Sequence, residues 1–217
     1  MNKIKVIKLV SKVVEEKFKG EATGHDYWHM VRVRDLALKI GKVEKCDLFI
    51  VELGALLHDI ADFKFVSGGD AVAPHIAREI LSKAGADEPT IVHIAKLITE
   101  VSFKGAGTKT IPSSKEGAAV QDADRLDALG AIGIARCFAY GGSKHRPIYD
   151  PKIKPGNHKT FEQYKNSNGT SLNHFYEKLL LVKDRMHTKT GKNIAKDRHA
   201  FLQNFLKQFH AEWEGKK

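Results

Sequence analysis

Apolar residues recur at helical spacing along most of the chain, and polar or glycine-containing stretches separate these segments. The first segment predicts an amphipathic helix that ends before Gly20, on the apolar positions Ile4, Ile7, Val10, Val13, Val14 and Phe18. The second predicts a helix that has His29 in its first turns and ends before Gly41. The third, residues 47–57, is nearly all apolar, so it predicts a buried central helix.

Further along the chain the same periodicity predicts helices at 73–83 and 88–100, with Gly85 between them. Residues 102–116 are rich in Gly, Lys, Thr, Ser and Pro and predict a loop, followed by a helix that begins near Asp122. Residues 141–169 are polar and contain prolines, and we interpret this long segment as a loop that covers a substrate. Two last helices are expected at 172–187 and 192–213, broken at Gly191, and no segment has a strand pattern. The pattern therefore predicts an all-α fold.

Length and composition favour one domain. The 217 residues are 42% hydrophobic, which is enough to bury a core without disulfides, and only Cys46 and Cys137 are present. The first helical segment contains several lysines and therefore does not resemble a signal peptide. No apolar run approaches the roughly 18 residues of a membrane span. We therefore expect a cytoplasmic protein with no membrane partner.

The formal charge is strongly positive, at +10 from 36 Lys and Arg against 26 Asp and Glu. Such a charge attracts phosphate-bearing molecules. The cations are spread through the chain rather than gathered on one element, which favours a small anionic substrate over a nucleic acid. A nucleotide is the partner that we expect, and a basic nucleic-acid-binding helical module remains an alternative.

Three polar clusters offer nitrogen and oxygen ligands for a metal ion. The first is Gly24–Val33, the second is the pair His58-Asp59 at the end of the apolar third helix, and the third is Gln121–Asp127. In the first cluster, His25 lies four residues before His29 and would share its helix face, so either histidine could be the ligand. Asp26 is expected to cap the helix or to support the site.

This order of residues resembles the HD-domain metal-dependent phosphohydrolases, in which a His, a His-Asp pair and a later Asp follow one another along the chain. The resemblance assigns the ligands to His29, His58, Asp59 and Asp124, and Arg32-Val33 favours His29 over His25. Residues 122–136 and 174–180 resemble one bacterial-type subgroup of small HD hydrolases, so the likeness covers nearly the whole chain. It implies a single-domain helical bundle over residues 1–217, with the motif core at about 20–140, the loop at about 141–170 and the C-terminal helices at about 171–214.

The resemblance also implies a cofactor and a reaction. Two imidazole nitrogens and two carboxylate oxygens suit one divalent ion, which could be Mn, Mg, Fe, Ni, Co or Zn. Such an ion can polarise a phosphoryl oxygen and activate water. We therefore expect hydrolysis of a nucleotide phosphoester or phosphoanhydride, by a nucleoside triphosphate pyrophosphohydrolase or a nucleotidase.

Several other residues are expected to serve this reaction. Asp62 and Lys64 follow the His58-Asp59 pair and are predicted to act in acid–base chemistry and phosphate contact. The predicted substrate-binding residues are His25, Arg125, Lys144 and Arg146. For Arg125 and Arg136, buried ion pairs with Asp122 or Asp127 are the alternative, and those two aspartates could also be ordinary acids at a helix start.

Two further alternatives remain open from the residues alone. The first is a regulatory protein that binds a metal or nucleotide without hydrolysing it. The second is a two-metal HD enzyme, which would need additional ligands between Asp59 and Asp124, where His75 and His93 are available. The remaining histidines lack a local partner pattern and are expected to be structural.

Overall fold

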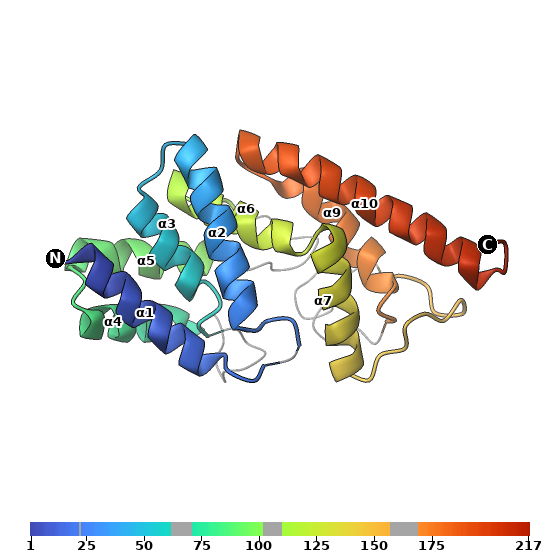
Figure 1. Ribbon diagram of the computed structural model, residues 1–217, viewed down its shortest axis with the longest axis horizontal. Helices are drawn as coiled ribbons and strands as arrows, with labels where there is room; N and C mark the ends of the chain where they lie inside the picture. The colour runs from blue at the N-terminus through green and yellow to red at the C-terminus, as the bar shows by residue number, and fades with distance from the viewer. Residues whose placement is uncertain (22, 62–70, 102–109, 157–168) are drawn as a thin grey trace. The chain divides into compact units, whose positions relative to one another are not determined.

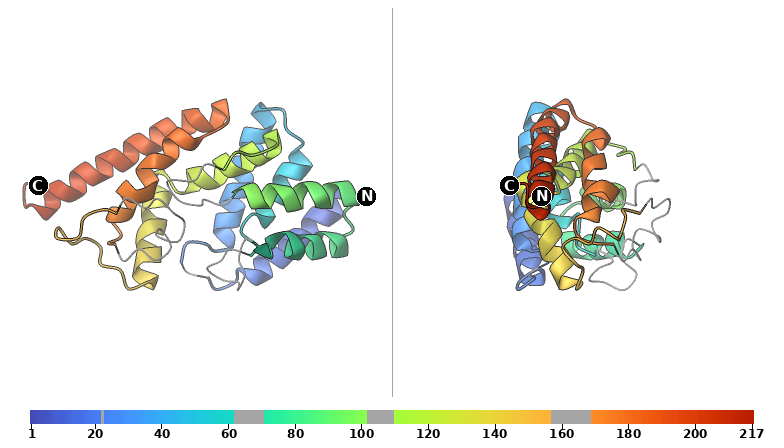
Figure 2. Two further views of the ribbon diagram at one scale, coloured as in Figure 1. Left: turned by 180° about the vertical axis from the view of Figure 1, so that it is seen from behind. Right: turned by 90° about the vertical axis from the view of Figure 1, so that its right-hand side faces the viewer.

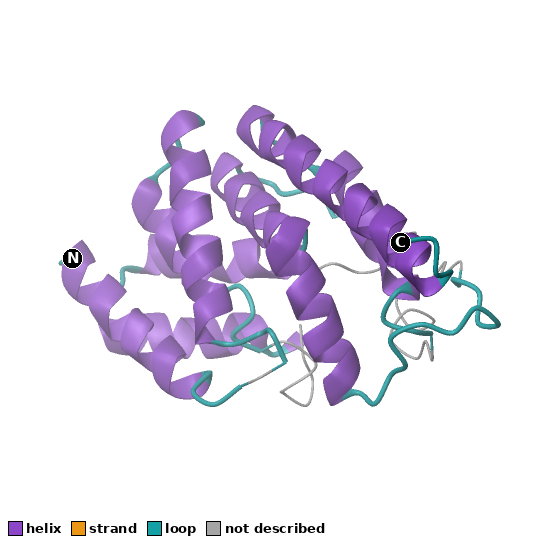
Figure 3. Ribbon diagram, turned by 45° about the vertical axis from the view of Figure 1, so that its right-hand side comes forward, coloured by secondary structure: helices purple, strands orange, loops and turns teal. Residues whose placement is uncertain are grey.

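The computed structural model describes residues 1–21, 23–61, 71–101, 110–156 and 169–217. These residues form helices and connecting segments, with no strand among them, so the all-α prediction is confirmed (Figure 3). The described residues divide into two compact units, one from Met1 to Asp124 and the other from Arg125 to Lys217. No helix in the described ranges is long and apolar enough to cross a membrane.

The first unit is built around a short apolar helix. Helix α3 packs against three others of this unit, as the nearly continuous apolar run of residues 47–57 predicts (Figure 1). Helices α4 and α5 lie side by side and are seen best from behind (Figure 2). The elements are α1 (Lys3–Lys17), α2 (Tyr27–Val43), α3 (Leu48–Leu57), α4 (Ala73–Ala84), α5 (Glu88–Val101) and α6 (Lys115–Asp127), whose last residues belong to the second unit.

Side-chain caps fix where α2 and α3 begin. Asp26 precedes α2 and accepts a hydrogen bond from the backbone N–H of His29 at 2.8 Å. Asp47 precedes α3 and accepts from the N–H of Phe49 at 2.9 Å. Such caps satisfy backbone donors that have no partner inside the helix. The capping alternative for Asp26 is confirmed, and it holds His29 in the first turn of α2.

Two details of the first helices differ from the predictions. Helix α1 buries Val6, Val10 and Val14, whereas Ile4 is 73% exposed, so the buried face is rotated from the predicted one. Helix α2 continues through Gly41 to Val43. A Cβ atom at Gly41 would lie only 3.2 Å from the side chain of Val51, so this glycine permits close packing of α2 on α3.

Helix α6 differs most from its prediction. It begins at Lys115, inside the predicted loop 102–116, and the hydroxyl of Ser114 accepts a hydrogen bond from the N–H of Gly117 at 3.0 Å. Because the helix ends at Asp127, the expectation that Asp122 and Asp127 are acids at a helix start is wrong. Asp124 and Asp127 lie in the last turn, where the helix dipole disfavours negative charge. Both carboxylates therefore require nearby positive groups.

The second unit is less regular than predicted. Residues 172–187 do not form one helix, because a π-helical turn and a 3₁₀ turn interrupt it and Met186 is extended. Gly191 does not break the last helix, since its N–H donates to the Thr188 hydroxyl at 2.8 Å as part of the cap. The elements are α7 (Gly130–Ser143), η2 (Phe175–Leu179), α9 (Leu180–Val182), η3 (Lys183–Arg185) and α10 (Lys189–Trp213).

Aromatic rings fill the core of this unit, where α7 packs against α10. Phe175 and Phe205 stack with their ring centroids 5.5 Å apart, and Phe138 contacts both rings. Helix α7 extends to Ser143, slightly into the predicted loop 141–169. Residues 157–168 of that loop lie outside the described residues, so its role in covering a substrate remains a prediction.

Candidate metal centre

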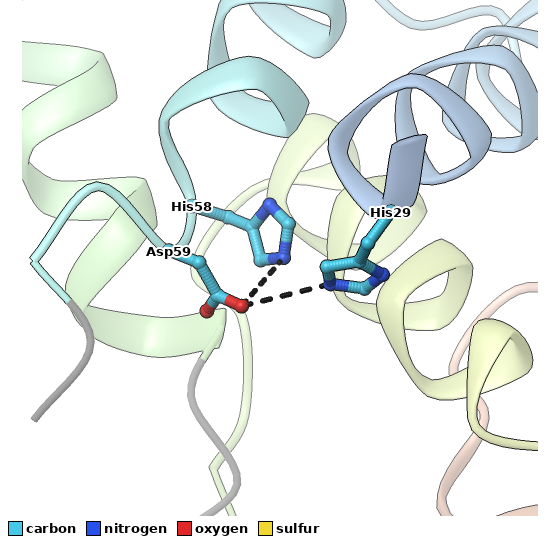
Figure 4. A group of neighbouring side chains, drawn as sticks. All are labelled: His29, His58 and Asp59. Atoms are coloured by element: carbon cyan, nitrogen blue, oxygen red, sulfur yellow. Dashed lines mark ion pairs between the residues drawn. The ribbon is translucent and has the colours of Figure 1, made fainter. Parts of the chain in front are cut away.

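Four side chains of the first unit converge at one place. His29 comes from the start of α2, His58 and Asp59 follow the end of α3, and Asp124 lies near the end of α6 (Figure 4 shows the first three). The Nε2 atom of His29 lies 3.6 Å from Asp59 Oδ2 and 3.5 Å from Asp124 Oδ1. The Nε2 atom of His58 lies 3.5 Å and 3.6 Å from the same two oxygens. Each imidazole nitrogen therefore faces both carboxylates at similar distances.

The backbone of α3 fixes the orientation of His58. Its Nδ1 atom lies 2.7 Å from the carbonyl oxygen of Ala55, one turn earlier. Because a carbonyl only accepts hydrogen bonds, Nδ1 carries the proton and Nε2 of the neutral ring is left as the ligand atom. The buried residues Leu56 and Leu57 anchor this turn in the core. The apolar run that predicts the central helix thus also aims His58.

The two sides of the cluster differ in exposure. The side chains of His29 and His58 are 0% exposed, whereas those of Asp59 and Asp124 are 14% and 24% exposed. Solvent therefore reaches the carboxylates but not the imidazoles. A ligand that arrives from solvent would meet the cluster on its carboxylate side.

The charges in the cluster perturb one another strongly. Burial alone would lower the pKa of His58, but the charge of Asp59 and the carboxylate of Asp124 outweigh burial and raise this pKa to about 9. Burial alone would raise the pKa of Asp124, but hydrogen bonding and the positive charge of His58 lower it to about 2. The metal-free site therefore favours a positive imidazole beside a negative carboxylate. Cationic charge is what this cluster stabilises.

The donor set fits a divalent ion. His29, His58 and Asp59 each offer a ligand atom, and these three atoms lie within 4.8 Å of one another. Adjacent ligands that share one ion at about 2.1 Å are separated by roughly 3.0–3.5 Å, close to the observed separations. The Nε2 atom of His58 is buried, and its contacts with the two carboxylate oxygens are long, at 3.5 Å and 3.6 Å. A buried nitrogen held this loosely is costly unless something else binds it. The arrangement is thus suited to an ion between the imidazoles and carboxylates.

His25, the rival first ligand, lies beside the cluster. Its ring contacts that of His29 edge-on, with the centroids 5.8 Å apart, while the ring centroids of His29 and His58 are 5.2 Å apart. Among the described residues, His25 is not in the group that could hold an ion. The structure thus brings His29 to His58 and Asp59 and leaves His25 half-buried behind His29. Substrate contact by His25 remains a prediction.

Two predicted arginines lie in the second unit. Arg125 is 4% exposed and donates to the carbonyl oxygen of Arg185, and its Nη1 atom lies 3.1 Å from His187 Nε2. Arg136 donates to Asp127 Oδ2 at 3.0 Å, which is the buried ion pair weighed as an alternative. Both residues therefore have structural partners, and phosphate binding by Arg125 remains a prediction.

The other predicted cations surround one aromatic ring of the second unit. Lys144 Nζ and the Arg146 guanidinium lie 5.7 Å and 5.9 Å from the centre of the Tyr140 ring. Lys144 is exposed and Arg146 is half-buried. Asp62 and Lys64 lie outside the described residues, so their predicted roles stay predictions.

The histidines needed by a two-metal enzyme are engaged elsewhere. His75 is 75% exposed and pairs with Glu79 at 3.1 Å, and His93 Nε2 lies 3.3 Å from the Ser114 hydroxyl. Neither belongs to the group of potential ligands in the described part of the chain. Sequence reasoning missed the carbonyl of Ala55, because a backbone carbonyl leaves no signal in the sequence.

Comparison with known proteins assigns the chain to a family. The HD domain family model matches residues 27–129, which include all four clustered residues. The Bacillus subtilis protein YpgQ is 37% identical over 220 residues, which cover 99% of this chain and 97% of YpgQ. This chain therefore belongs to the HD-domain family, as the order of its motifs predicts. HD domains bind divalent metal ions.

Solved structures share the whole fold. A Lactobacillus plantarum protein is 37% identical with a TM-score of 0.86, and the match covers 97% of each chain. An HD-superfamily hydrolase from Bacillus thuringiensis is 38% identical with a TM-score of 0.74, over 98% of this chain and 99% of the other. YpgQ has been solved in complex with ADP, and that structure is 33% identical with a TM-score of 0.77, over 98% of this chain and 97% of YpgQ.

Proposed function

We propose that this chain is a metal-dependent phosphohydrolase that cleaves a phosphoester or phosphoanhydride bond of a nucleotide. The observation that carries the proposal is the geometry of the cluster. Two buried imidazole nitrogens face two partly exposed carboxylate oxygens at 3.5–3.6 Å, and this set of donors suits a divalent ion.

His29, His58, Asp59 and Asp124 would hold that ion. When bound, a divalent ion polarises a phosphoryl oxygen and lowers the pKa of bound water. The protein contributes the fixed orientation of its ligands, through the Ala55 carbonyl at His58 and the Asp26 cap beside His29. Water and a phosphate group would approach the ion from the partly exposed carboxylate side, while burial keeps the imidazoles in place.

A nucleotide substrate is supported by two independent observations. YpgQ, a relative over nearly its full length, has been crystallised with ADP. The formal charge of +10 favours an anionic substrate. Of the residues proposed to bind it, Lys144 and Arg146 are accessible to a phosphate, His25 adjoins His29, and Arg125 is the most buried. Asp62 and Lys64 are proposed to act in proton transfer and phosphate contact.

The products decide which bond is cleaved. A pyrophosphohydrolase converts a nucleoside triphosphate to the monophosphate and releases pyrophosphate, whereas a nucleotidase releases phosphate from a monophosphate. We would incubate the protein with Mn²⁺ and a panel of nucleoside mono-, di- and triphosphates and measure both products. Asp124→Ala should lose the activity, because it removes one proposed ligand.

Asp35→Ala provides the matched control for this assay. Asp35 lies on α2 in the same unit, but its side chain is 60% exposed and pairs with Arg34. It should retain full activity, which would exclude a nonspecific effect of losing an aspartate. The loss of activity in Asp124→Ala would exclude a contaminating enzyme. Absence of product from every nucleotide, in a protein shown to bind Mn²⁺, would overturn hydrolysis and favour a regulatory protein.

A further inference from the structure

The side chain of Gln121 is a fully buried polar group without a charge. It lies on α6, one helical turn before Asp124, and it is 0% exposed. Its Nε2 atom donates to the backbone carbonyl of Glu100 at 2.5 Å and to the hydroxyl of Thr110 at 3.1 Å. Both hydrogens of the amide are thereby directed at acceptors outside α6.

The acceptor residue Glu100 is itself held by the chain that leads into α6. Its Oε2 atom accepts hydrogen bonds from the N–H and the hydroxyl of Ser113, at 2.8 Å and 3.0 Å. The last turn of α5 therefore contacts this part of the chain through both backbone and side chain. Gln121 is the member of this network that lies within α6 itself, close to the end that carries Asp124.

This network connects the helices that position different metal ligands. Helix α5 packs against α3, and α3 ends directly before His58 and Asp59. Apolar contacts also join α6 to these helices, since a Cβ atom at Gly54 would lie 3.4 Å from Val120 and one at Gly117 would lie 3.7 Å from Leu97. Apolar contacts set the spacing of helices but are not directional. Hydrogen bonds have narrow geometry and can fix how far α6 is rotated and shifted.

We infer that Gln121 is a positioning residue of the proposed metal centre, which holds Asp124 at the distance that a shared ion requires. The inference rests on the proposed function only for the presence of an ion. Gln suits this position because its amide donates two hydrogen bonds, whereas Glu would place a carboxylate against the carbonyl oxygen of Glu100. Met fills a similar volume without any donor.

The test compares Gln121→Met with Glu116→Met. Glu116 lies on the same helix, is 6% exposed and accepts a hydrogen bond from the Asp47 N–H at 2.9 Å, but it is at the end far from Asp124. Titration calorimetry would measure Mn²⁺ binding to each metal-free protein, and visible absorption would report the ligands of bound Co²⁺. Hydrolysis would be assayed in parallel.

Gln121→Met should bind Mn²⁺ about 10–100-fold more weakly, the effect typical of losing a group that orients a metal ligand. Its Co²⁺ spectrum should shift toward that of Asp124→Asn. Glu116→Met should keep wild-type Mn²⁺ affinity and the wild-type Co²⁺ spectrum even where it lowers the thermal midpoint. Unchanged Mn²⁺ affinity in Gln121→Met, or equal losses in both variants, would overturn the inference.

Thr110→Val decides the question where Gln121→Met does not fold. It removes one acceptor of the Gln121 amide and leaves the Glu100 carbonyl in place. Weaker Mn²⁺ binding supports the positioning role, and wild-type affinity contradicts it. A wild-type protein that binds Mn²⁺ but hydrolyses nothing refutes the proposed reaction and leaves the role of Gln121 measurable. A wild-type protein that binds no Mn²⁺ refutes the metal centre and the inference together.

Discussion

Two aspartates in the last turn of α6 face positive groups in different ways. Asp127 meets the Arg136 guanidinium at 3.0 Å, and its side chain is 5% exposed. Asp124, one turn earlier, is 24% exposed and lies 3.5 Å and 3.6 Å from the imidazoles of His29 and His58. The helix dipole disfavours both carboxylates equally, so each needs a cation. Asp127 has its cation at 3.0 Å, whereas the two imidazoles near Asp124 lie farther away, at 3.5 Å and 3.6 Å.

These distances and exposures indicate that Asp127 forms a structural ion pair, whereas Asp124 lies at a site that can bind a ligand. A buried pair is stable when its charges are in contact and share hydrogen bonds, as Asp127 and Arg136 do. At Asp124, the carboxylate and the two imidazoles are not in direct contact, and the carboxylate is partly exposed to solvent. We therefore expect Asp127 to act mainly in stability and Asp124 mainly in metal binding.

The largest expected effect is the loss of metal binding in Asp124→Asn. Because the amide has no negative charge, we expect Mn²⁺ affinity and Mn²⁺-dependent hydrolysis to fall more than about 100-fold, beyond the effect of losing a supporting residue. The free energy of unfolding without metal should fall by less than in Asp127→Ala, because the side chain of Asp124 is 24% exposed whereas that of Asp127 is 5% exposed. Calorimetry would measure the Mn²⁺ affinity, and urea unfolding would measure the free energy of unfolding. If Asp124→Asn unfolded instead of losing metal, Asp124 and Asp127 would not differ in role as proposed.

Asp127→Ala should show the opposite pattern. Removal of one partner leaves Arg136 largely buried without its carboxylate, which typically costs about 3–5 kcal/mol. Urea unfolding of the metal-free protein should show this loss, while the Mn²⁺ affinity of the folded protein should stay within a few-fold of wild type. A loss of metal affinity as large as that of Asp124→Asn would mean that the two aspartates act as one unit.

Gly54→Val should affect both properties together. A Cβ atom at Gly54 would already lie 3.0 Å from Leu97 and 3.4 Å from Val120, so the larger side chain must separate α3 from α5 and α6. Overpacking of this kind costs about 1–3 kcal/mol. It should also weaken Mn²⁺ binding, because His58 and Asp124 lie on the separated elements. Gly54→Val combined with Leu97→Ala should recover both measurements, and no recovery would contradict this explanation.

The remaining prediction concerns the dependence of stability on pH. In the metal-free protein, the raised pKa of His58, about 9 against an ordinary 6.5, adds stability that is complete below pH 6.5 and lost as the pH rises through 9. The lowered pKa of Asp124, about 2 against 3.8, adds stability above pH 3.8 that is lost as the pH falls through 2. Thermal midpoints in chelator should therefore decline between pH 6.5 and 9.

The Mn²⁺ affinity should rise over the pH range in which the thermal midpoint of the metal-free protein declines. An ion competes with the proton on His58 Nε2, so Mn²⁺ affinity should rise by up to about tenfold per pH unit below pH 9. Asp124→Asn removes one source of the raised pKa and should flatten the decline of the metal-free midpoint. Equal pH profiles for wild type and Asp124→Asn would show that the two side chains do not interact.

The sequence predicts the part of the site that apolar packing determines. His58 ends a run of apolar residues, so both its helix and its burial follow from periodicity. His29 follows from a capped helix start with Asp26 in front. The grouping of these residues with Asp124 came from resemblance to a family, because spacing along the chain does not determine which helices meet.

The sequence does not predict the parts that depend on distant polar contacts. The apolar stripe of α6 starts only at Ala119 and continues through Ala123 and Leu126, so the first turn carries no periodic signal and the start of the helix depends on the Ser114 cap. Near its end, Arg198 of α10 donates to the carbonyl of Leu126 at 2.6 Å, a contact made across many residues of sequence. One acceptor of the Gln121 amide is a backbone carbonyl, which every residue has, so no pattern of side chains reveals this contact.

The unequal exposure of imidazoles and carboxylates has a consequence for how quickly an ion is exchanged. A hydrated ion that enters from solvent would reach Asp59 and Asp124 first and exchange water for carboxylate oxygen before it contacts either buried ring. An ion that leaves must give up both nitrogens before it is fully rehydrated. Capture would then be fast and nearly independent of imidazole protonation, whereas release to a chelator would be slow and accelerated by acid.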